Sequence, residues 1–351
     1  MIPVGADKPT GFRGGKTRPE QAFENDFAAV IAATFRPMPL HNPDAILDTL
    51  TEDRLRLQYE GELAYLRGDF AQTIDCFNRT AGDDAARLRA CPIAVAATIS
   101  LGDYGTYTEI ERYLKKAAAG EGSAAAMGQL SLATAAVSVI APNMVPEWLK
   151  SGDFGALPLQ VLPNAFYLRA KYFLSTRAYE AMLTTAQTAL AFSATPVGVT
   201  TTDLYLRISC AVACYCMEKI DQAEQHLLDT LSLALPHGFL TPLAEHIILL
   251  GGLMEKCLEQ EYPVFYDAVI RQWERTWNNW IQFHNRFTQD NLTLILSQRE
   301  YYIAMQAARR IPYARIAQQQ GISVGRLKNI MQGIYEKLYI SNRSELAKLV
   351  F

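Results

Sequence analysis

Long apolar runs are missing from this chain, although half of its 351 residues are hydrophobic. The longest stretch, Leu130–Ala141, has about 12 residues, whereas a membrane-spanning helix needs about 20. The first residues, MIPVGADKPTG, lack the apolar core of a secretory signal. The six cysteines show no disulfide-framework spacing, which excludes a small secreted scaffold. The sequence therefore predicts a cytoplasmic protein with reduced thiols and no membrane contact.

Alternating runs of β-branched residues are also nearly absent, which excludes a large sheet. From about residue 20 onward, Leu, Ala, Tyr and Phe recur at three- and four-residue spacing with short breaks, as expected of amphipathic helices. Before this point the chain is rich in Gly, Pro, Lys and Arg. We predict a flexible tail at residues 1–19 and an all-α sensor or interaction domain at residues 20–290.

Internal repetition is visible in this domain. A Gly-Asp-aromatic turn occurs at Gly68–Phe70 and again, 34 residues later, at Gly102–Tyr104, which is the tetratricopeptide period. The segments Ala170–Leu190 and Ala211–Leu231 have the same helix–turn–helix outline, with turns near residues 177 and 219, but do not keep the period. Because one hairpin cannot bury its own apolar face, neighbours must stack. We predict an irregular tetratricopeptide-like helical-hairpin solenoid, with a generic helical bundle as the alternative.

No catalytic constellation is present in the sequence. Gly11–Thr17 approaches a phosphate-binding loop, but Thr10 stands where the first glycine is required and no strand precedes it. Cys210, Cys214 and Cys216 lie close together, yet no histidine completes a tetrahedral set, so buried thiols are favoured over a metal site. We expect a protein that is not an enzyme and that holds neither cofactor nor metal.

Charge is unevenly distributed along the chain. Residues 291–351 hold nine Lys and Arg residues against three acidic ones, a net charge of +6, which leaves −9 for the rest. A basic module on an acidic body suggests a polyanionic partner for the module.

Four short helices are predicted in the basic module. The first covers Gln298–Arg309, and Pro312 suits the opening of the second. Gly321–Ser323 forms a turn in which Ser323 can cap the third helix. Asn342, with Glu345 three residues on, is typical of a capping box at the start of the fourth.

The third helix has two chemically different faces. The apolar face comprises Val324, Leu327, Ile330, Met331, Ile334 and Leu338. The opposite face carries Lys328, Asn329 and Gln332, whose ammonium and amide groups suit base edges in the major groove. Ser323, Arg326 and Lys337 are placed for DNA phosphates, which position a protein without specifying a sequence. An ordinary solvated helix face is the alternative interpretation.

Six short motifs lie within about 55 residues of this module. They are Leu296-Ser297-x-Arg299-Glu300, Ile316-Ala317, Gly321-Ile322-Ser323, Lys328-Asn329, Ile334-Tyr335-x-Lys337-Leu338 and Ser341-Asn342-Arg343-x-Glu345-Leu346. Together they resemble the DNA-binding domain of the LuxR (NarL/FixJ) family of bacterial regulators. The resemblance implies a four-helix helix-turn-helix domain at residues 291–351. Its third helix would enter the major groove of double-stranded DNA, commonly as a homodimer.

Several positions depart from the pattern of that family. Arg310 and Tyr339 stand where the family usually has Gly, which predicts altered turns, and Ile330 stands where His is frequent. Arg315 and Arg326 replace Glu and Thr and add positive charge, which favours DNA binding. The body resembles, more weakly, the helical-repeat region of MalT-like LuxR regulators, without their ATPase module.

These features predict a sequence-specific DNA-binding transcriptional regulator whose helical body senses an unknown small molecule, peptide or protein. The alternative is a tetratricopeptide-like adaptor with a degenerate helix-turn-helix, as the residues in the two turns suggest. Trp273, Trp277 and Trp280 share one helix face, which either packs on the body or forms a dimer interface. The sequence does not identify residues that bind the effector.

Overall fold

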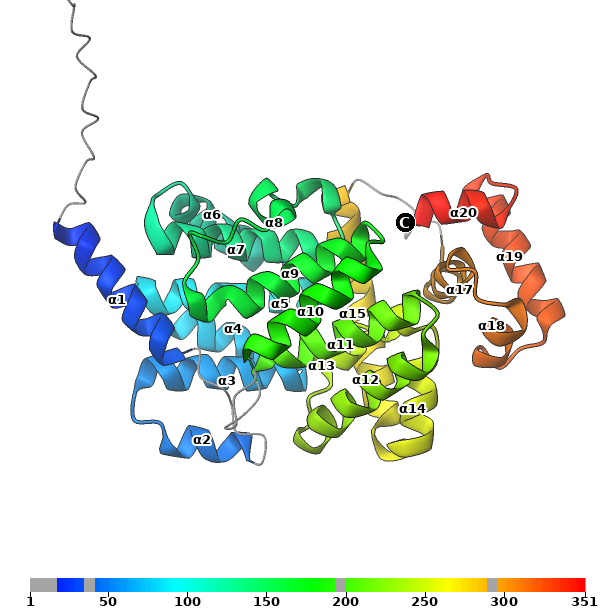
Figure 1. Ribbon diagram of the computed structural model, residues 1–351, viewed down its shortest axis with the longest axis horizontal. Coiled ribbons are helices and arrows are strands. Elements are labelled where there is room, and N and C mark those ends of the chain that lie inside the picture. Colours follow the sequence, from blue (N-terminus) through cyan, green and yellow to red (C-terminus); the bar gives the residue numbers. More distant parts are fainter. Residues whose placement is uncertain (1–17, 35–41, 194–199, 289–295, 351) are drawn as a thin grey trace, which may run out of the picture.

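The structure is a computed structural model that describes residues 18–34, 42–193, 200–288 and 296–350 (Figure 1). Every regular element within these ranges is a helix, so the all-α prediction is confirmed for this part of the chain. None of the described helices is long and apolar enough to cross a membrane. Most of the predicted tail at residues 1–19, including the loop-like segment Gly11–Thr17, lies outside the described residues.

Helices alternate with turns throughout the described residues. In order they are α1 (Arg18–Thr34), α2 (Pro43–Thr49), α3 (Asp53–Arg67), α4 (Phe70–Arg79), α5 (Asp84–Leu101), α6 (Tyr104–Ala118), α7 (Gly122–Ser138), η1 (Pro142–Met144), α8 (Glu147–Ser151), η2 (Leu159–Val161), α9 (Leu162–Ser175), α10 (Tyr179–Ser193), α11 (Thr201–Cys216), α12 (Ile220–Ala234), η3 (Leu235–His237), α13 (Thr241–Ala244), η4 (Ile247–Leu250), α14 (Leu253–Glu261), α15 (Pro263–Thr288), α17 (Gln298–Ala308), α18 (Tyr313–Gln319), α19 (Val324–Leu338) and α20 (Arg343–Val350).

The two Gly-Asp-aromatic segments form tight turns between antiparallel neighbours, as the sequence predicts. Gly68 ends α3 with a φ of 84°, and the side chain of Asp69 caps α4 by accepting a backbone N–H at 3.0 Å. Gly102 and Asp103 repeat this arrangement between α5 and α6, with a φ of 72° and a cap of 3.0 Å. Glycine tolerates the positive φ, and the short aspartate side chain satisfies an exposed helix N–H.

The later pairs α9–α10 and α11–α12 also turn where the sequence predicts, near residues 177 and 219. Here non-glycine residues take the positive φ, 60° at Arg177 and 63° at Glu218. The four helices pack in sequence order, each against the next. Alanines such as Ala170 and Ala211 are fully buried in this packing, because a small side chain lets two helix backbones approach closely.

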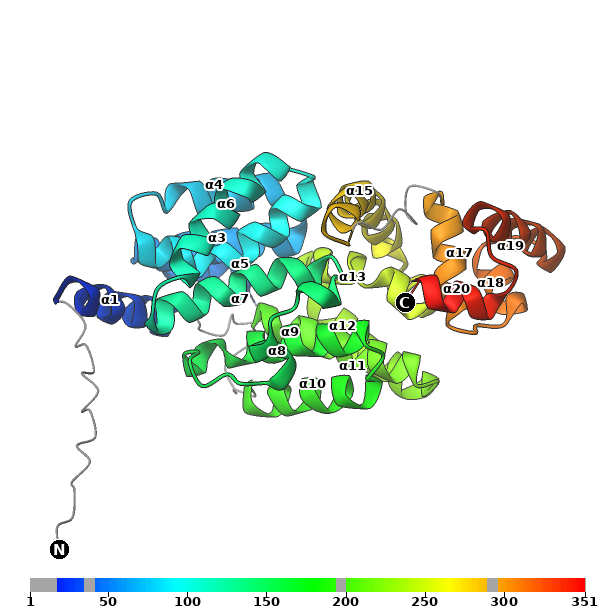
Figure 2. The same cartoon turned by 90° about the horizontal axis from the view of Figure 1, so that it is seen from above.

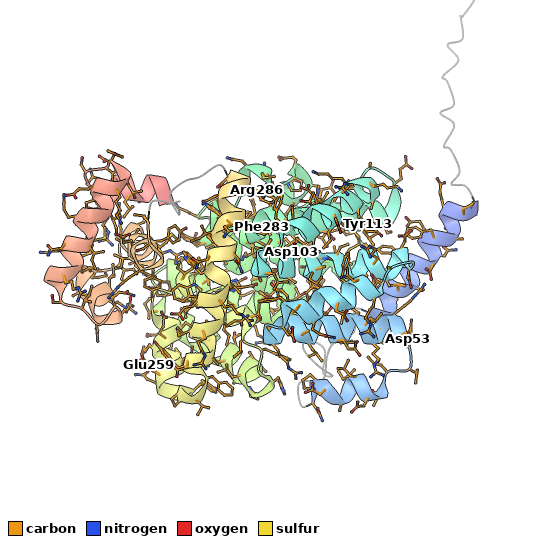
Figure 3. The ribbon with its side chains drawn as sticks, turned by 180° about the vertical axis from the view of Figure 1, so that it is seen from behind. Asp53, Asp103, Tyr113, Glu259, Phe283 and Arg286 are labelled. Carbon is orange, nitrogen blue, oxygen red and sulfur yellow. The ribbon has the colours of Figure 1, made fainter. Side chains whose placement is uncertain are left out.

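Helix α15 is the longest described helix and runs along the body (Figure 3). Phe283 packs edge-on against Tyr107 at 5.3 Å between ring centroids, and the Arg286 guanidinium lies 3.3 Å from the centroid of the Tyr104 ring. These contacts tie the end of α15 to the start of α6. Between α7 and α9 the chain forms only the short helical turns η1, α8 and η2.

Helices α17, α18, α19 and α20 lie together at one end of the molecule, opposite α1 (Figures 1 and 2). They are not separated from the body by solvent. Ile303 and Ala307 of α17 belong to the same hydrophobic core as Leu249 and Leu250 of the body. The basic module predicted from charge is therefore docked on the helical body.

Candidate nucleic-acid interface

The turns and caps of the C-terminal module follow the sequence closely. The Ser297 hydroxyl accepts the Glu300 N–H at 3.3 Å, while the Glu300 carboxylate accepts the Ser297 N–H at 2.9 Å. Pro312 precedes α18 directly, and Gly321 has a φ of 59° in the turn before α19. Ser323 caps α19, because its hydroxyl accepts the Arg326 N–H at 3.2 Å. Helix α17, the first helix of the module, ends at Ala308, one residue earlier than predicted.

The start of the last helix differs in detail from a capping box. The Asn342 side chain accepts the Glu345 N–H at 3.0 Å, as predicted. The Glu345 carboxylate, however, accepts from the Ser341 N–H at 2.8 Å and from the Asn342 side-chain amide. In a capping box the Glu345 carboxylate would accept the N–H of Asn342, whereas here it accepts the N–H of the preceding residue, Ser341. The exposed N–H groups at this helix start therefore still have acceptors.

Helix α19 has one buried apolar face and one exposed polar face. Leu327, Met331 and Ile334 are almost completely buried, whereas Ile330 is half-buried. Val324, which the sequence placed on the core face, is 39% exposed, because it stands in the first turn where α19 extends beyond its neighbours. Lys328, predicted to contact bases, is exposed on the opposite side.

The other predicted base contacts share that exposed face. Asn329 is exposed, and Gln332, one turn further along α19, is exposed as well. The Gln332 amide donates to the Glu336 carboxylate at 3.0 Å, so it is held within the helix. Lys328 and Asn329 are therefore the more available pair of donors on this face. Helix α19 itself lies on the side of the module away from the body (Figure 1).

The three residues predicted to contact phosphates are all exposed, but they differ in the contacts that they already make within the protein. Ser323 and Arg326 stand at the N-terminus of α19, where the helix dipole favours an anion. Lys337, near the other end, forms an ion pair with Glu300 of α17 at 2.7 Å. Burial disfavours the ionised Glu300, but hydrogen bonds from Lys337 and Ser297 outweigh it and hold its pKa below the ordinary value. Lys337 thus joins α19 to α17.

Two arginines join separate elements of the module. Arg299 donates to the Gln320 backbone oxygen at 3.0 Å, which fixes the start of α17 against the turn after α18. Arg343 donates to the backbone oxygens of Ala307 and Ile311, the latter at 2.8 Å, and so fixes α20 against the turn after α17. Both arginines are part of the motifs found in the sequence, and both serve packing within the module.

No protein-family model, curated protein or solved structure matches this chain. Its function is therefore inferred from its own residues and their geometry.

The turns at Arg310 and Tyr339 keep the conformation for which glycine is suited. Their φ values are 62° and 54°, although the sequence predicted that these turns would be altered. The Tyr339 N–H bonds to the Glu336 oxygen at 3.3 Å, and the Arg310 N–H bonds to the Ala307 oxygen at 2.8 Å, which closes both helix ends. An L residue in this region is strained by about 1–2 kcal/mol.

Replacing Tyr339 by glycine is expected to raise the free energy of unfolding by about 1 kcal/mol, because the strain is relieved. Tyr339 is 96% exposed, so the change removes no packing. Urea unfolding measures the difference. The control is Ala314→Gly in α18, where a glycine at an ordinary helical position costs about 1 kcal/mol. Equal destabilisation by both changes would show that the turn at Tyr339 is not strained.

The module docks on the body through polar contacts as well as apolar ones. The Gln306 amide of α17 donates to the Ile248 backbone oxygen at 3.3 Å, and Arg309 donates to the Leu249 backbone oxygen. Gln319 of α18 donates to the Gly251 backbone oxygen. The segment that contains η4 is thus the seat of the module. No local pattern indicates this interface, because its partners lie about 60 residues apart along the chain.

A carboxylic acid lies inside this docking interface. The Tyr302 hydroxyl of α17 donates to Glu255 of α14 at 3.1 Å. Burial raises the pKa of Glu255 from 4.5 to about 7, and the nearby Glu259 charge adds to the shift. The group is therefore mostly protonated in the folded protein at pH 6, while it is ionised in the unfolded chain.

We expect Glu255 to make stability depend on pH. Because the folded pKa is the higher one, its stabilisation is fully present below about pH 4.5 and is lost as the pH rises through 7, a total of about 3 kcal/mol. Urea unfolding from pH 4.5 to 8 measures this slope in the natural protein and in Glu255→Gln. The variant should be flatter by that amount across this window. Parallel curves would contradict the shifted pKa.

The tryptophan stripe of α15 faces the body and the docked module. Trp277 is 5% exposed and lies 5.1 Å from the Tyr301 ring of α17, between centroids. Trp280 donates from its indole nitrogen to the Ser138 backbone oxygen at 2.9 Å. Of the two interpretations of this stripe, packing within the chain is the one observed.

The clustered cysteines of α11 lie in the core. Cys210 and Cys214 are buried and Cys216 is half-buried. Burial raises the pKa of the Cys210 thiol to about 12, which disfavours the thiolate that binds metals. Among the described residues, no group of three His, Cys, Asp or Glu side chains is placed to hold a metal ion.

Proposed function

We propose that this chain is a sequence-specific DNA-binding transcriptional regulator. Its C-terminal helices form a LuxR-type helix-turn-helix, and α19 is its recognition helix. The observation that carries the proposal is the exposed pair Lys328 and Asn329 on a helix whose other face is buried. Lys can donate to guanine O6 and N7, and Asn can pair with adenine N6 and N7.

The surroundings of α19 support this role. Its first turn offers the exposed Ser323 hydroxyl, the Arg326 guanidinium and the positive end of the helix dipole, a combination suited to phosphate. The module as a whole carries a net charge of +6. Glu336 opposes this charge, but it stands near the C-terminal end of α19, away from Ser323 and Arg326.

The motif residues support the family assignment by their contacts. Arg299, Arg343 and the Glu300–Lys337 pair each join two parts of the module, which is what a compact four-helix domain requires of such residues. The family implies that two copies bind an inverted repeat, so we propose a homodimer acting on double-stranded DNA in the cytoplasm. The tetratricopeptide-like body would sense the effector.

A binding titration with fluorescent DNA from the region upstream of its own gene, in the presence of competitor DNA, tests the proposal. We expect preferential binding to one site, with an affinity that falls steeply as salt rises, because phosphate contacts release counterions. A random-sequence pool serves as the second substrate. Weak binding that is identical on all sequences of that pool would overturn the proposal and favour a protein-interaction adaptor instead.

A further inference from the structure

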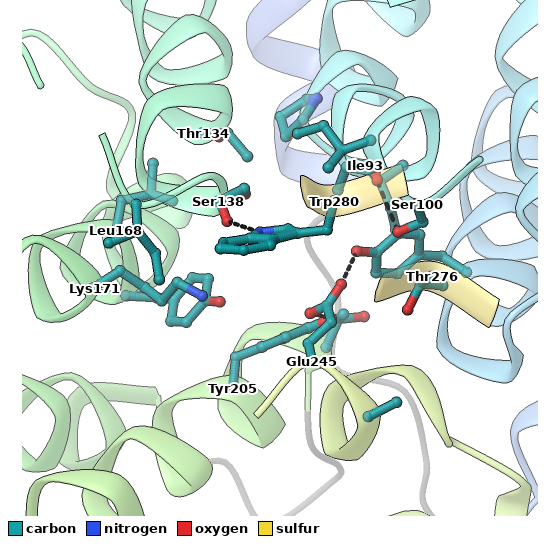
Figure 4. Close-up of a pocket in the computed structure, with 18 of the residues that line it drawn as sticks. Ile93, Ser100, Thr134, Ser138, Leu168, Lys171, Tyr205, Glu245, Thr276 and Trp280 are labelled. Atoms are coloured by element: carbon teal, nitrogen blue, oxygen red, sulfur yellow. Dashed lines mark hydrogen bonds between the residues drawn. The ribbon is translucent and has the colours of Figure 1, made fainter. Parts of the chain in front are cut away.

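A cavity of about 210 Å³ is lined by residues of the helical body, of α15 and of the docked module. Figure 4 shows part of its wall. Trp273, Trp277 and Trp280 of α15 line it, and Tyr301 and Met305 of α17 complete the wall. A buried apolar cavity of about 150 Å³ takes up benzene, so this one has room for a ligand of roughly ten non-hydrogen atoms. The ligand would touch the sensor region and the first helix of the module at once.

Two charged side chains of opposite sign point into this space (Figure 4). Glu245 is already engaged, because one carboxylate oxygen accepts from the Tyr65 hydroxyl and the other accepts from the Tyr205 hydroxyl at 2.9 Å. Lys171 differs. Its ammonium lies 6.0 Å from the centroid of the Tyr167 ring, and it makes no hydrogen bond or ion pair with any described residue.

A second charged pair lines the cavity and is also engaged. Arg89 and Glu62 form an ion pair at 2.9 Å, and the Thr201 hydroxyl donates to Glu62 at 3.2 Å. Both carboxylates of the cavity therefore accept hydrogen bonds from the protein, whereas the Lys171 ammonium donates none to the described residues. Glu245 is near enough to act on Lys171 electrostatically, but its oxygens accept from the two tyrosines, so an anionic group that contacts the Lys171 ammonium directly is the complement that this wall lacks.

The other residues that line the cavity indicate the chemistry of the rest of the ligand. The indole N–H groups of Trp273 and Trp277 are buried and have no acceptor within the described protein. Aromatic rings and aliphatic side chains such as Ile93 and Leu168 supply most of the remaining surface. This wall suits a flat apolar group that also carries an acceptor oxygen.

We propose that this cavity binds a small aromatic carboxylate, with its carboxylate on Lys171 and its ring against the tryptophans of α15. Since α17 forms part of the wall, occupancy changes the docking of the module and with it the affinity for DNA. This last step rests on the function proposed above. The binding step does not.

Tryptophan fluorescence measures binding directly, because three of the four tryptophans of the chain line the cavity. The probes are phenylacetate and cinnamate, with phenylacetamide and phenethylamine as uncharged and cationic controls. We expect saturable binding of the carboxylates at least about tenfold tighter than that of phenylacetamide, since hydrogen bonds to charged groups are the stronger ones. No response to either carboxylate up to about 10 mM, a very weak affinity for ten atoms, overturns the proposal. Preferential binding of phenethylamine overturns it as well.

Lys171→Met is the decisive variant, with Lys116→Met on the exposed end of α6 as the matched control. We expect Lys171→Met to lose about tenfold to a hundredfold in affinity for phenylacetate while its affinity for phenylacetamide is unchanged. If Lys171→Met does not fold, Trp277→Phe keeps an aromatic ring and removes the N–H, and should weaken phenylacetate binding severalfold. Unchanged phenylacetate binding in a folded Lys171→Met overturns the assignment of the carboxylate.

The link to DNA is tested by repeating the DNA titration at saturating phenylacetate. We expect a change of about fivefold or more in DNA affinity in the natural protein and none in Lys171→Met, and DNA must change phenylacetate affinity by the same factor. If phenylacetate binds but no DNA does, the proposed function fails and the cavity assignment stands. If DNA binds specifically and no carboxylate does, the cavity assignment alone fails.

Discussion

Replacing Lys328 and Asn329 together by alanine should lower the affinity for the specific DNA site by about a hundredfold or more. Each bidentate contact to a base contributes about 1–3 kcal/mol of discrimination, and the variant removes two. Neither side chain is needed for the fold, because both are exposed and alanine has the highest helix propensity. Thermal unfolding of the variant should therefore be unchanged within error.

The measurement is a titration of the specific site and of a random-sequence pool at several salt concentrations. The double variant should bind both alike, whereas Arg326→Ala should weaken binding to both equally and reduce the salt slope by about 1. Lys116→Ala, which removes one positive charge from the body, controls for general electrostatics. If the double variant keeps its preference for the specific site, α19 is not the recognition helix.

Local signals carried most of what the sequence predicted correctly. Gly68 and Asp69 determine one turn within four residues, and the Ser323 cap of α19 is equally local. The same reasoning was wrong at Tyr339, where a missing glycine predicted an altered turn. There a tyrosine takes the positive φ, and backbone hydrogen bonds from Tyr339 to Glu336 and from Ile340 to Tyr335 close the helix end without a glycine.

The docking seat and the cavity escaped prediction for a related reason. Lys171, Glu245 and Trp277 come from α9, the segment after α13, and α15, so no spacing in the sequence links them. One signal was present: Lys171, together with Arg169, interrupts a run of apolar residues in α9. A lysine in such a position is either a surface residue on a helix edge or a buried charge with a purpose, and only the fold distinguishes the two.

Gly251→Ala should lower the free energy of unfolding by about 3 kcal/mol and loosen the docked module. Gly251 has a φ of 54°, and a Cβ at this position would overlap the Tyr215 hydroxyl and the Gln306 side-chain amide. Positive φ costs alanine about 1–2 kcal/mol. Displacing the neighbours also threatens the hydrogen bonds that Tyr215, at 3.3 Å, and Gln319 donate to the Gly251 oxygen, each worth about 1 kcal/mol.

Gly238→Ala is the matched control for this change. Gly238 has a φ of 71°, but no atom lies within 4 Å of the added Cβ, so only the backbone cost of about 1–2 kcal/mol applies. Urea unfolding compares the two variants, and hydrogen exchange of the α17 amides reports the docking. Faster exchange in Gly251→Ala, with exchange unchanged in Gly238→Ala, is the expected pattern, because only Gly251 supports the module. Equal losses of stability with α17 protected in both would mean that the module does not depend on this seat. In that case a ligand in the cavity would have to act on α17 through Tyr301 and Met305 alone.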